Sequence, residues 1–193
     1  MVPMLSTEPE RRVKDYLLSV ARESIECGLS NQKYRPTLSA EFSQLAEEAA
    51  TFVTLKTASN SLRGCIGTLQ AHEPLFLSVS HNAKAAAFSD PRFPAVNSIE
   101  WPTLKLSISI LSAAKPMSFS SEQDLLQQLT PGVDGLILKE QLHSSTFLPS
   151  VWDELSDKQE FINHLKIKAG LTADYWSDTI QFSNYQTFSF SGK

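Results

Sequence analysis

Hydrophobic residues at helical spacing predict a helix near the N-terminus that ends at about Gly28. Thr7 can cap the start of this helix with Glu10 reciprocating, and Pro9 suits the first turn because the N–H it lacks has no partner there. The inward face consists of small and aliphatic side chains: Val13, Leu17, Val20, Ala21 and Ser24. A further short helix is expected within residues 40–50.

A hairpin, a helix and a strand are expected next. Residues 52–55 and 62–69 are rich in strand formers, and the turn residues 58–61 between them indicate a hairpin. Pro74 suits the first turn of a helix that runs to about Phe88. Hydrophobic and polar residues then alternate, as is typical of a half-buried strand. The hydrophobic positions of that strand are Leu104, Leu106, Ile108 and Ile110.

The same order of elements is expected again after a linking helix near residues 121–129. Strands are predicted at 135–138 and 145–148, a helix at 157–169 with Gly170 as its stop, and closing strands at 180–182 and 188–190. The predicted fold class is α+β, with two hairpin–helix–strand units that form mixed or antiparallel sheets, flanking helices, and an N-terminal helix. We expect one domain over residues 1–193, made of two intertwined subdomains at about 5–115 and 116–190.

Composition narrows the classes of function. The formal net charge of −4 argues against broad nucleic-acid binding, because a mildly acidic surface repels phosphates. No apolar run approaches the roughly 18 residues of a membrane span, so no membrane association is expected. Residues 1–10 lack the basic start and apolar run of a signal peptide. The expected location is therefore the cytoplasm, where Cys27 and Cys65 would be reduced thiols.

The strongest candidate for chemistry is the segment Leu62-Arg63-Gly64-Cys65-Ile66-Gly67. In a regular strand Arg63, Cys65 and Gly67 share one face, and a guanidinium close to a thiol favours the nucleophilic thiolate. Gly64 and Gly67 cost strand stability, and glycine inside a strand marks a bulge or a close approach by a ligand or by backbone. The alternative is that Cys65 is an unreactive residue that fills space in the core.

This segment resembles the signature hexapeptide of the AMME-syndrome candidate-protein family, whose prokaryotic members are called AmmeMemoRadiSam system protein A. Further similar blocks lie in order around it, over roughly residues 5–190. They are residues 52–55, 74–75, 82–83, 86–87, 90–93, 108–112, 135–136, 147–149 and 168–171. Several blocks in register are a stronger sign than one hexapeptide.

The resemblance implies an α+β fold with two subdomains and a cleft beside the hexapeptide, but no established activity. Members of the family often occur in genomes together with a Memo-type protein and a radical-SAM protein. The resemblance therefore implies these two as the expected protein partners. The chain departs from the family in two places. Ser59-Asn60-Ser61 replaces a glycine frequent in the hairpin, and Ser150 stands where glutamine is frequent, which puts any role of that glutamine in doubt.

Asp90-Pro91-Arg92-Phe93 is the second candidate block. One interpretation is a helix stop with a local Asp90–Arg92 pair of little energetic value. The other places Asp90 and Arg92 at the cleft, with Arg92 and Arg63 forming an anion clamp. Both stay open at this point.

No cofactor and no metal site are predicted. The four histidines lack the spacing of metal-binding motifs, there are only two cysteines, and there is no glycine-rich nucleotide loop. His81 could form a Cys–His pair with Cys65, although such a histidine is more often an exposed helical residue.

Three functions remain. The favoured hypothesis is a cytosolic enzyme, or a component of one, that acts on a small anionic or carbonyl-bearing molecule. Cys65 would then be the nucleophile or ligand-contacting thiol and Arg63 its electrostatic partner, with Gly64, Gly67, Asp90 and Arg92 around the ligand. The alternatives are a non-catalytic partner or scaffold of a Memo-type or radical-SAM protein, and nucleic-acid binding or modification, which the net charge disfavours.

Overall fold

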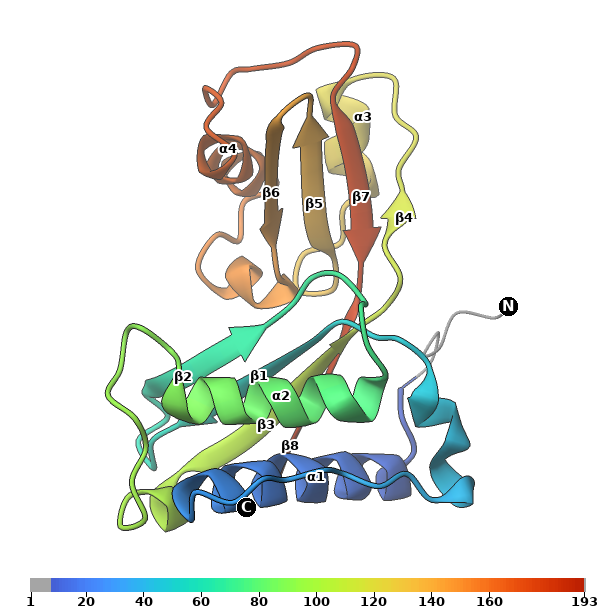
Figure 1. Cartoon of the computed structure of the whole chain (residues 1–193). Coiled ribbons are helices and arrows are strands. Elements are labelled where there is room, and N and C mark those ends of the chain that lie inside the picture. Colours follow the sequence, from blue (N-terminus) through green and yellow to red (C-terminus); the bar gives the residue numbers. More distant parts are fainter. Residues whose placement is uncertain (1–7, 193) are drawn as a thin grey trace. The chain divides into compact units, whose positions relative to one another are not determined.

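The computed structural model describes residues 8–192 and divides into two compact units (Figure 1). The first unit ends at Ser112 and takes in the chain again from Phe188, and the second unit is Ala113–Thr187. Each unit has its own four-stranded sheet with helices against it. The predicted α+β fold class is thereby confirmed.

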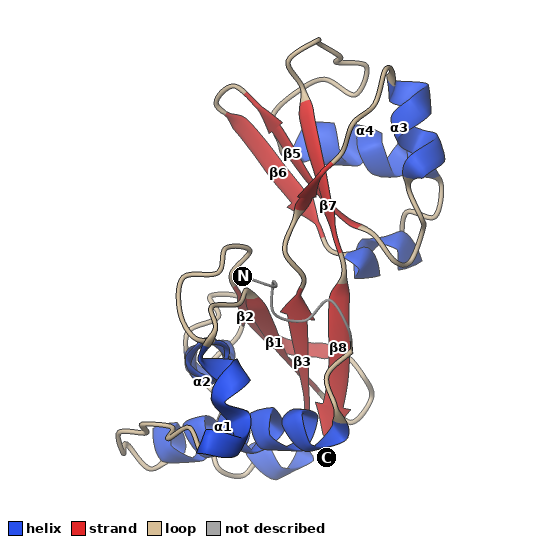
Figure 2. Ribbon diagram, turned by 90° about the vertical axis from the view of Figure 1, so that its right-hand side faces the viewer, coloured by secondary structure: helices blue, strands red, loops and turns tan. Residues whose placement is uncertain are grey.

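The sheet of the first unit has the strand order β2-β1-β3-β8, so β2 is an edge strand. The strands are β1 (Thr51–Lys56), β2 (Leu62–Gly67), β3 (Lys105–Leu111) and β8 (Thr187–Gly192). Helices α1 (Arg11–Leu29) and α2 (Leu75–Phe88) lie on the same face of this sheet (Figure 2). Two 3-10 helices complete the unit, η1 (Ala40–Ala46) and η2 (Trp101–Thr103).

Alternation along the strands gives this sheet one apolar and one polar face. Val53 and Leu55 of β1 and Ile108 of β3 are fully buried in the core with α1 and α2. The intervening residues therefore point away from the helices. We call that side the polar face. Phe52 lies on it opposite Ser109, and its polar residues and its cysteine are Thr54, Lys56, Cys65, Lys105, Ser107, Ser109, Ser189 and Ser191.

The predicted helix limits hold to within a residue or two, except that the short helix expected within residues 40–50 is the 3-10 helix η1, which ends at Ala46. Helix α1 continues one residue past Gly28, and Ser30 follows it. Thr7, the expected cap, lies outside the described residues, and the residue in the cap position is Glu10. Pro74 immediately precedes α2, as its position in the sequence predicts.

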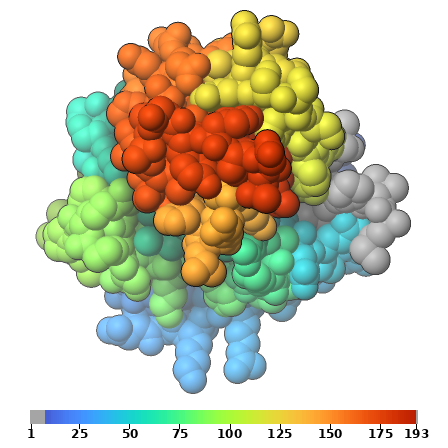
Figure 3. Space-filling view, turned by 90° about the horizontal axis from the view of Figure 1, so that it is seen from above, coloured from blue at the N-terminus to red at the C-terminus, as the bar shows by residue number. Residues whose placement is uncertain are grey.

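The second unit has the strand order β4-β7-β5-β6. Its strands are β4 (Lys115–Pro116), β5 (Gly135–Glu140), β6 (His143–Phe147) and β7 (Gln181–Tyr185). Its helices are α3 (Glu122–Gln128), the 3-10 helix η3 (Pro149–Asp153) and α4 (Lys158–Lys168). Figure 3 shows the surface of these residues in colours from yellow to red.

In the second unit, capping residues set where the helices start and end, and aromatic side chains pack in the core. Ser121 accepts a hydrogen bond from the backbone N–H of Asp124 at the start of α3, and Asp157 does the same for Glu160 in α4. Gly170 has φ +82° just after α4, a conformation that favours glycine. In the core, the rings of Trp152 and Phe161 stack with centroids 3.7 Å apart.

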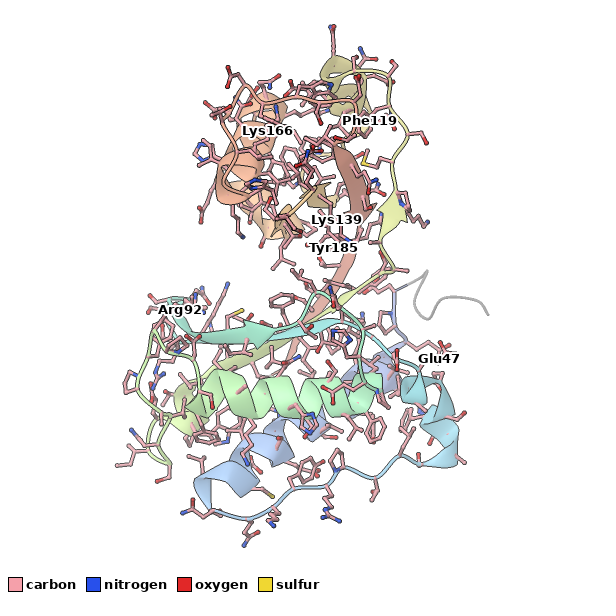
Figure 4. The ribbon with its side chains drawn as sticks, turned by 45° about the horizontal axis from the view of Figure 1, so that its top comes forward. Glu47, Arg92, Phe119, Lys139, Lys166 and Tyr185 are labelled. Atoms are coloured by element: carbon pink, nitrogen blue, oxygen red, sulfur yellow. The ribbon has the colours of Figure 1, made fainter. Side chains whose placement is uncertain are left out.

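An ion pair with a fully buried lysine joins α3 and α4. Lys166 of α4 is fully buried, and its Nζ lies 2.7 Å from Oε1 of Glu122 in α3. Figure 4 shows Lys166 among the side chains of this unit. No helix within residues 8–192 is long and apolar enough to cross a membrane.

Candidate functional site

The hexapeptide forms the edge strand β2, and its glycines are packed against protein atoms. A methyl group on Gly64 would fall within 3.0 Å of the backbone carbonyl oxygen of Ala86 in α2. One on Gly67 would overlap the ring of Phe52 and the carbonyl oxygen of Thr51. Contact with helix and strand is therefore sufficient to explain both glycines, and a role in ligand binding stays a prediction.

Cys65 is partly exposed on the polar face, beside β1. Its Sγ lies 3.2 Å from Oγ1 of Thr54, its directly opposite residue on β1. The backbone of Cys65 is held from the other side. Its N–H donates to Oδ2 of Asp90 at 2.8 Å, and its carbonyl oxygen accepts from Nη2 of Arg92 at 3.1 Å.

Asp90 is the centre of this arrangement. Its side chain is 2% exposed and accepts from the backbone N–H, Nε and Nη2 of Arg92 at 3.1, 3.0 and 2.7 Å. The hydrogen bonds from the Arg92 side chain, then those from the N–H groups of Cys65 and Arg92, hold the pKa of Asp90 well below its usual range. The pair therefore stays ionised and occupies the free backbone groups of an edge strand.

The Arg92 guanidinium is both fixed and accessible. Its side chain is 53% exposed, and Figure 4 shows it at the sheet end next to β2. The hydrogen bonds to Asp90 raise the pKa of Arg92 further. The guanidinium carbon lies 5.5 Å from the ring centroid of Phe93. This geometry leaves part of a positive charge facing solvent close to Cys65.

The guanidinium of Arg63 binds the carboxylate of Glu100. Its Nε and Nη2 donate to the two carboxylate oxygens of Glu100 at 2.5 and 2.9 Å, and Nη2 also donates to the carbonyl oxygen of Pro94 at 2.9 Å. Nη1 is buried with no hydrogen-bond partner. The guanidinium therefore fastens the segment 94–100 to β2. The expected partnership of Arg63 with the Cys65 thiol stays a prediction, and Arg92 is the better placed cation.

The other sequence candidates lie apart from Cys65. Nδ1 of His81 lies 2.7 Å from Oε2 of Glu73, on the exposed side of α2, so it is paired with a carboxylate. Cys27 is a second free thiol, in α1. Within residues 8–192 no group of three His, Cys, Asp or Glu side chains is arranged to hold a metal ion.

Two contacts were not predicted from the sequence. Glu100 lies 37 residues from Arg63, and no pattern links the two. The contact between Asp90 and the Cys65 N–H spans 25 residues. The only signal for it was that both residues fall in blocks similar to the same family.

Asp90→Asn is expected to lower the melting temperature by several degrees at pH 7, because the amide loses the charge that Arg92 and two N–H groups stabilise. Folding lowers the pKa of Asp90, so its ionised carboxylate stabilises the fold at pH values above the unfolded pKa of about 4. This contribution is lost as the pH falls below that value. The gap between the variant and the natural protein should therefore narrow below about pH 4. Circular dichroism melts from pH 7 to pH 2 measure it.

The control for this experiment is Asp178→Asn, at an exposed aspartate with no ion pair among the described residues. It should change the melting temperature little at any pH. A gap for Asp90→Asn that is equally wide at pH 7 and pH 2 would contradict the role of the charge.

The fold and site together define a class of protein. It is an α+β protein with two four-stranded sheets, whose cysteine-bearing edge strand is held by a buried aspartate and its arginine. A family model described as AMMECR1 matches residues 18–190. The chain therefore belongs to the AMMECR1 family, and the resemblance seen in the hexapeptide and its neighbouring blocks is confirmed.

Similar proteins support the family and the fold. The chain is 34% identical over 164 residues to protein NEQ441 of Nanoarchaeum equitans, which covers 84% of this chain and 90% of that one. It is 32% identical over 173 residues to protein MK0488 of Methanopyrus kandleri, with 84% and 79% covered. The crystal structure of uncharacterized protein PH0010 from Pyrococcus horikoshii is similar with a TM-score of 0.83 and 28% identity, covering 95% and 93% of the two chains. None of these names states an activity.

Proposed function

We propose that the chain is a cytosolic enzyme, or a component of one, that binds a small anionic or carbonyl-bearing molecule at Cys65 and Arg92. One observation carries the proposal. The buried carboxylate of Asp90 holds both the backbone of Cys65 and the guanidinium of Arg92. A nucleophile and a cation are thus fixed at one place while each remains partly exposed.

The chemistry that suits this pair is addition of the thiol to a carbonyl group. The sulfur electron pair would form a C–S bond while the carbonyl π electrons move to oxygen, and the thiol proton would end on that oxygen. The hydroxyl of Thr54, 3.2 Å from Sγ, can donate a hydrogen bond to the sulfur as it loses its proton. Arg92 would attract the anionic part of the molecule.

Alkylation of the two cysteines tests this proposal. Iodoacetate carries a negative charge and iodoacetamide does not, so the ratio of their rates measures the positive charge next to a thiol. We expect this ratio to be about fivefold higher at Cys65 than at Cys27, since one nearby opposite charge contributes about 1 kcal/mol in a watery setting. Mass spectrometry of peptides from the same sample gives both ratios.

Arg92→Gln provides the matched variant. It should reduce the iodoacetate rate at Cys65 while changing the iodoacetamide rate little, so that the ratio falls to that of Cys27. An unchanged ratio in this variant would contradict the assignment of Arg92. A Cys65 that reacts with neither reagent in the folded protein would contradict the thiol chemistry.

The alternative is a non-catalytic partner of a Memo-type or radical-SAM protein. The exposure of two leucines favours it, since Leu62 of the hexapeptide is 40% exposed and Leu69, two residues after the hexapeptide, is 38% exposed. Apolar side chains at an edge strand can contribute to a protein interface. An unreactive Cys65 in the alkylation experiment would support this alternative.

A further inference from the structure

A second candidate site lies on the polar face of the same sheet. A cavity of about 310 Å³ opens where β1 ends and β3 begins. Its polar lining comes from β1, the hairpin turn, β3 and β8: Lys56, Asn60, Lys105, Ser107, Ser189 and Ser191. We propose that this cavity binds a small oxyanion of the phosphate type, as inorganic phosphate or as the phosphoryl group of a small molecule. The proposal does not rest on the thiol chemistry of Cys65.

The first argument is an uncompensated pair of like charges. Lys56 and Lys105 are directly opposite each other on β1 and β3. Like charges in this arrangement destabilise a sheet. Within residues 8–192 neither lysine forms an ion pair with a carboxylate. A bound anion would relieve the repulsion that the pair creates.

The position of Lys105 is fixed by neutral groups. Its Nζ donates to Oδ1 of Asn60 at 2.7 Å and to the carbonyl oxygen of Ala58 at 3.1 Å. These acceptors hold the ammonium group at the hairpin turn without cancelling its charge. An ammonium group has three donors, so one N–H of Lys105 remains for a ligand.

Three serine hydroxyls lie next to this charge. Oγ of Ser107 donates a long hydrogen bond of 3.5 Å to the carbonyl oxygen of Thr54, and Oγ of Ser189 lies 2.8 Å from Oγ of Ser109, so a ligand would share or replace these contacts. Ser107 lies on β3 and Ser189 and Ser191 lie on β8, the neighbouring strand. Hydroxyl groups and ammonium groups are the donors that a phosphate-type oxyanion accepts from. A volume of about 310 Å³ is at the lower end for ligand pockets, which favours a small ligand. A polar face that is merely solvated needs neither the paired lysines nor a cavity.

Titration of the full chain with inorganic phosphate tests this site. The ¹⁵N-labelled protein is followed by NMR while sodium chloride keeps the ionic strength constant. We expect saturable shifts of the backbone amides of Ser107, Ser189 and Ser191. Lys56→Gln should weaken phosphate binding about tenfold or more, because a hydrogen bond to a charged group is lost.

Two further measurements make the result decisive. Lys139→Gln removes an exposed lysine from β5 of the second unit and should leave binding unchanged. Without phosphate, Lys56→Gln should keep or raise the melting temperature, since Lys56 Nζ makes no hydrogen bond in the described part of the chain and loses only repulsion. Shifts that do not saturate, or equal affinities for the natural protein and Lys56→Gln, would overturn the proposal.

Discussion

Gly64→Ala is expected to lower the free energy of unfolding by about 3 kcal/mol, at the upper end of what overpacking costs. The new methyl group would fall within 3.0 Å of the carbonyl oxygen of Ala86. That oxygen belongs to the backbone of α2 and cannot turn aside as a flexible side chain could. Either β2 or the helix must shift, which disturbs the core beneath them. Urea unfolding followed by circular dichroism measures the loss.

Gly132→Ala is the control for this prediction. Its added methyl group meets no atom within 4 Å, but its φ of +77° is strained for alanine. It should cost only about 1 kcal/mol. Equal losses for the two variants would show that β2 does not need its close contact with α2. Gly64 would then be better explained by the approach of a ligand.

Arg63→Ala is expected to lower the free energy of unfolding by about 3 kcal/mol. The substitution leaves the carboxylate of Glu100 partly buried and without an opposite charge. The substitution removes both hydrogen bonds to Glu100 and the one to the Pro94 carbonyl. The Arg63 side chain is 11% exposed and that of Glu100 is 27% exposed, so water replaces these bonds poorly. Urea unfolding again provides the measurement.

A double-mutant cycle separates this role from a role at the thiol. The combined variant Arg63→Ala, Glu100→Ala should lose less stability than the sum of the two single variants, because either one alone leaves a charge unpaired. If Arg63→Ala leaves the free energy of unfolding unchanged and lowers the iodoacetate preference of Cys65 instead, Arg63 serves the thiol, as the sequence first predicted.

Most of the fold could be predicted because its signals are local. Alternation along residues 104–110 and the helix-starting Pro74 and Asp157 lie within a few residues of the elements that they define. The sheet that each of the last two strands joins could not be predicted. β7 and β8 are separated by one residue, yet they join different sheets. β8 alternates and β7 does so only in part, and neither pattern selects a partner strand.

The candidate site was predicted in part for the same reason. The face shared by Cys65 and Thr54 follows from strand alternation and hairpin pairing. The direction of the Arg63 guanidinium does not, because the pairing of β1 and β2 shifts register between Leu55 and Lys56 and breaks the alternation at Arg63. Arg63 and Gly64 are both buried, and the guanidinium binds Glu100. The expectation that Arg63 and Cys65 share one face of a regular strand therefore does not hold.

The two ties between β2 and the end of α2 have a mechanical consequence. Gly64 rests against Ala86 in the last turn of that helix, and Asp90, two residues beyond its end, holds Cys65 and Arg92. A displacement of α2 would therefore act on Cys65 and Arg92 together, through Ala86 and Asp90, while the pairing with β1 restrains the other side of β2.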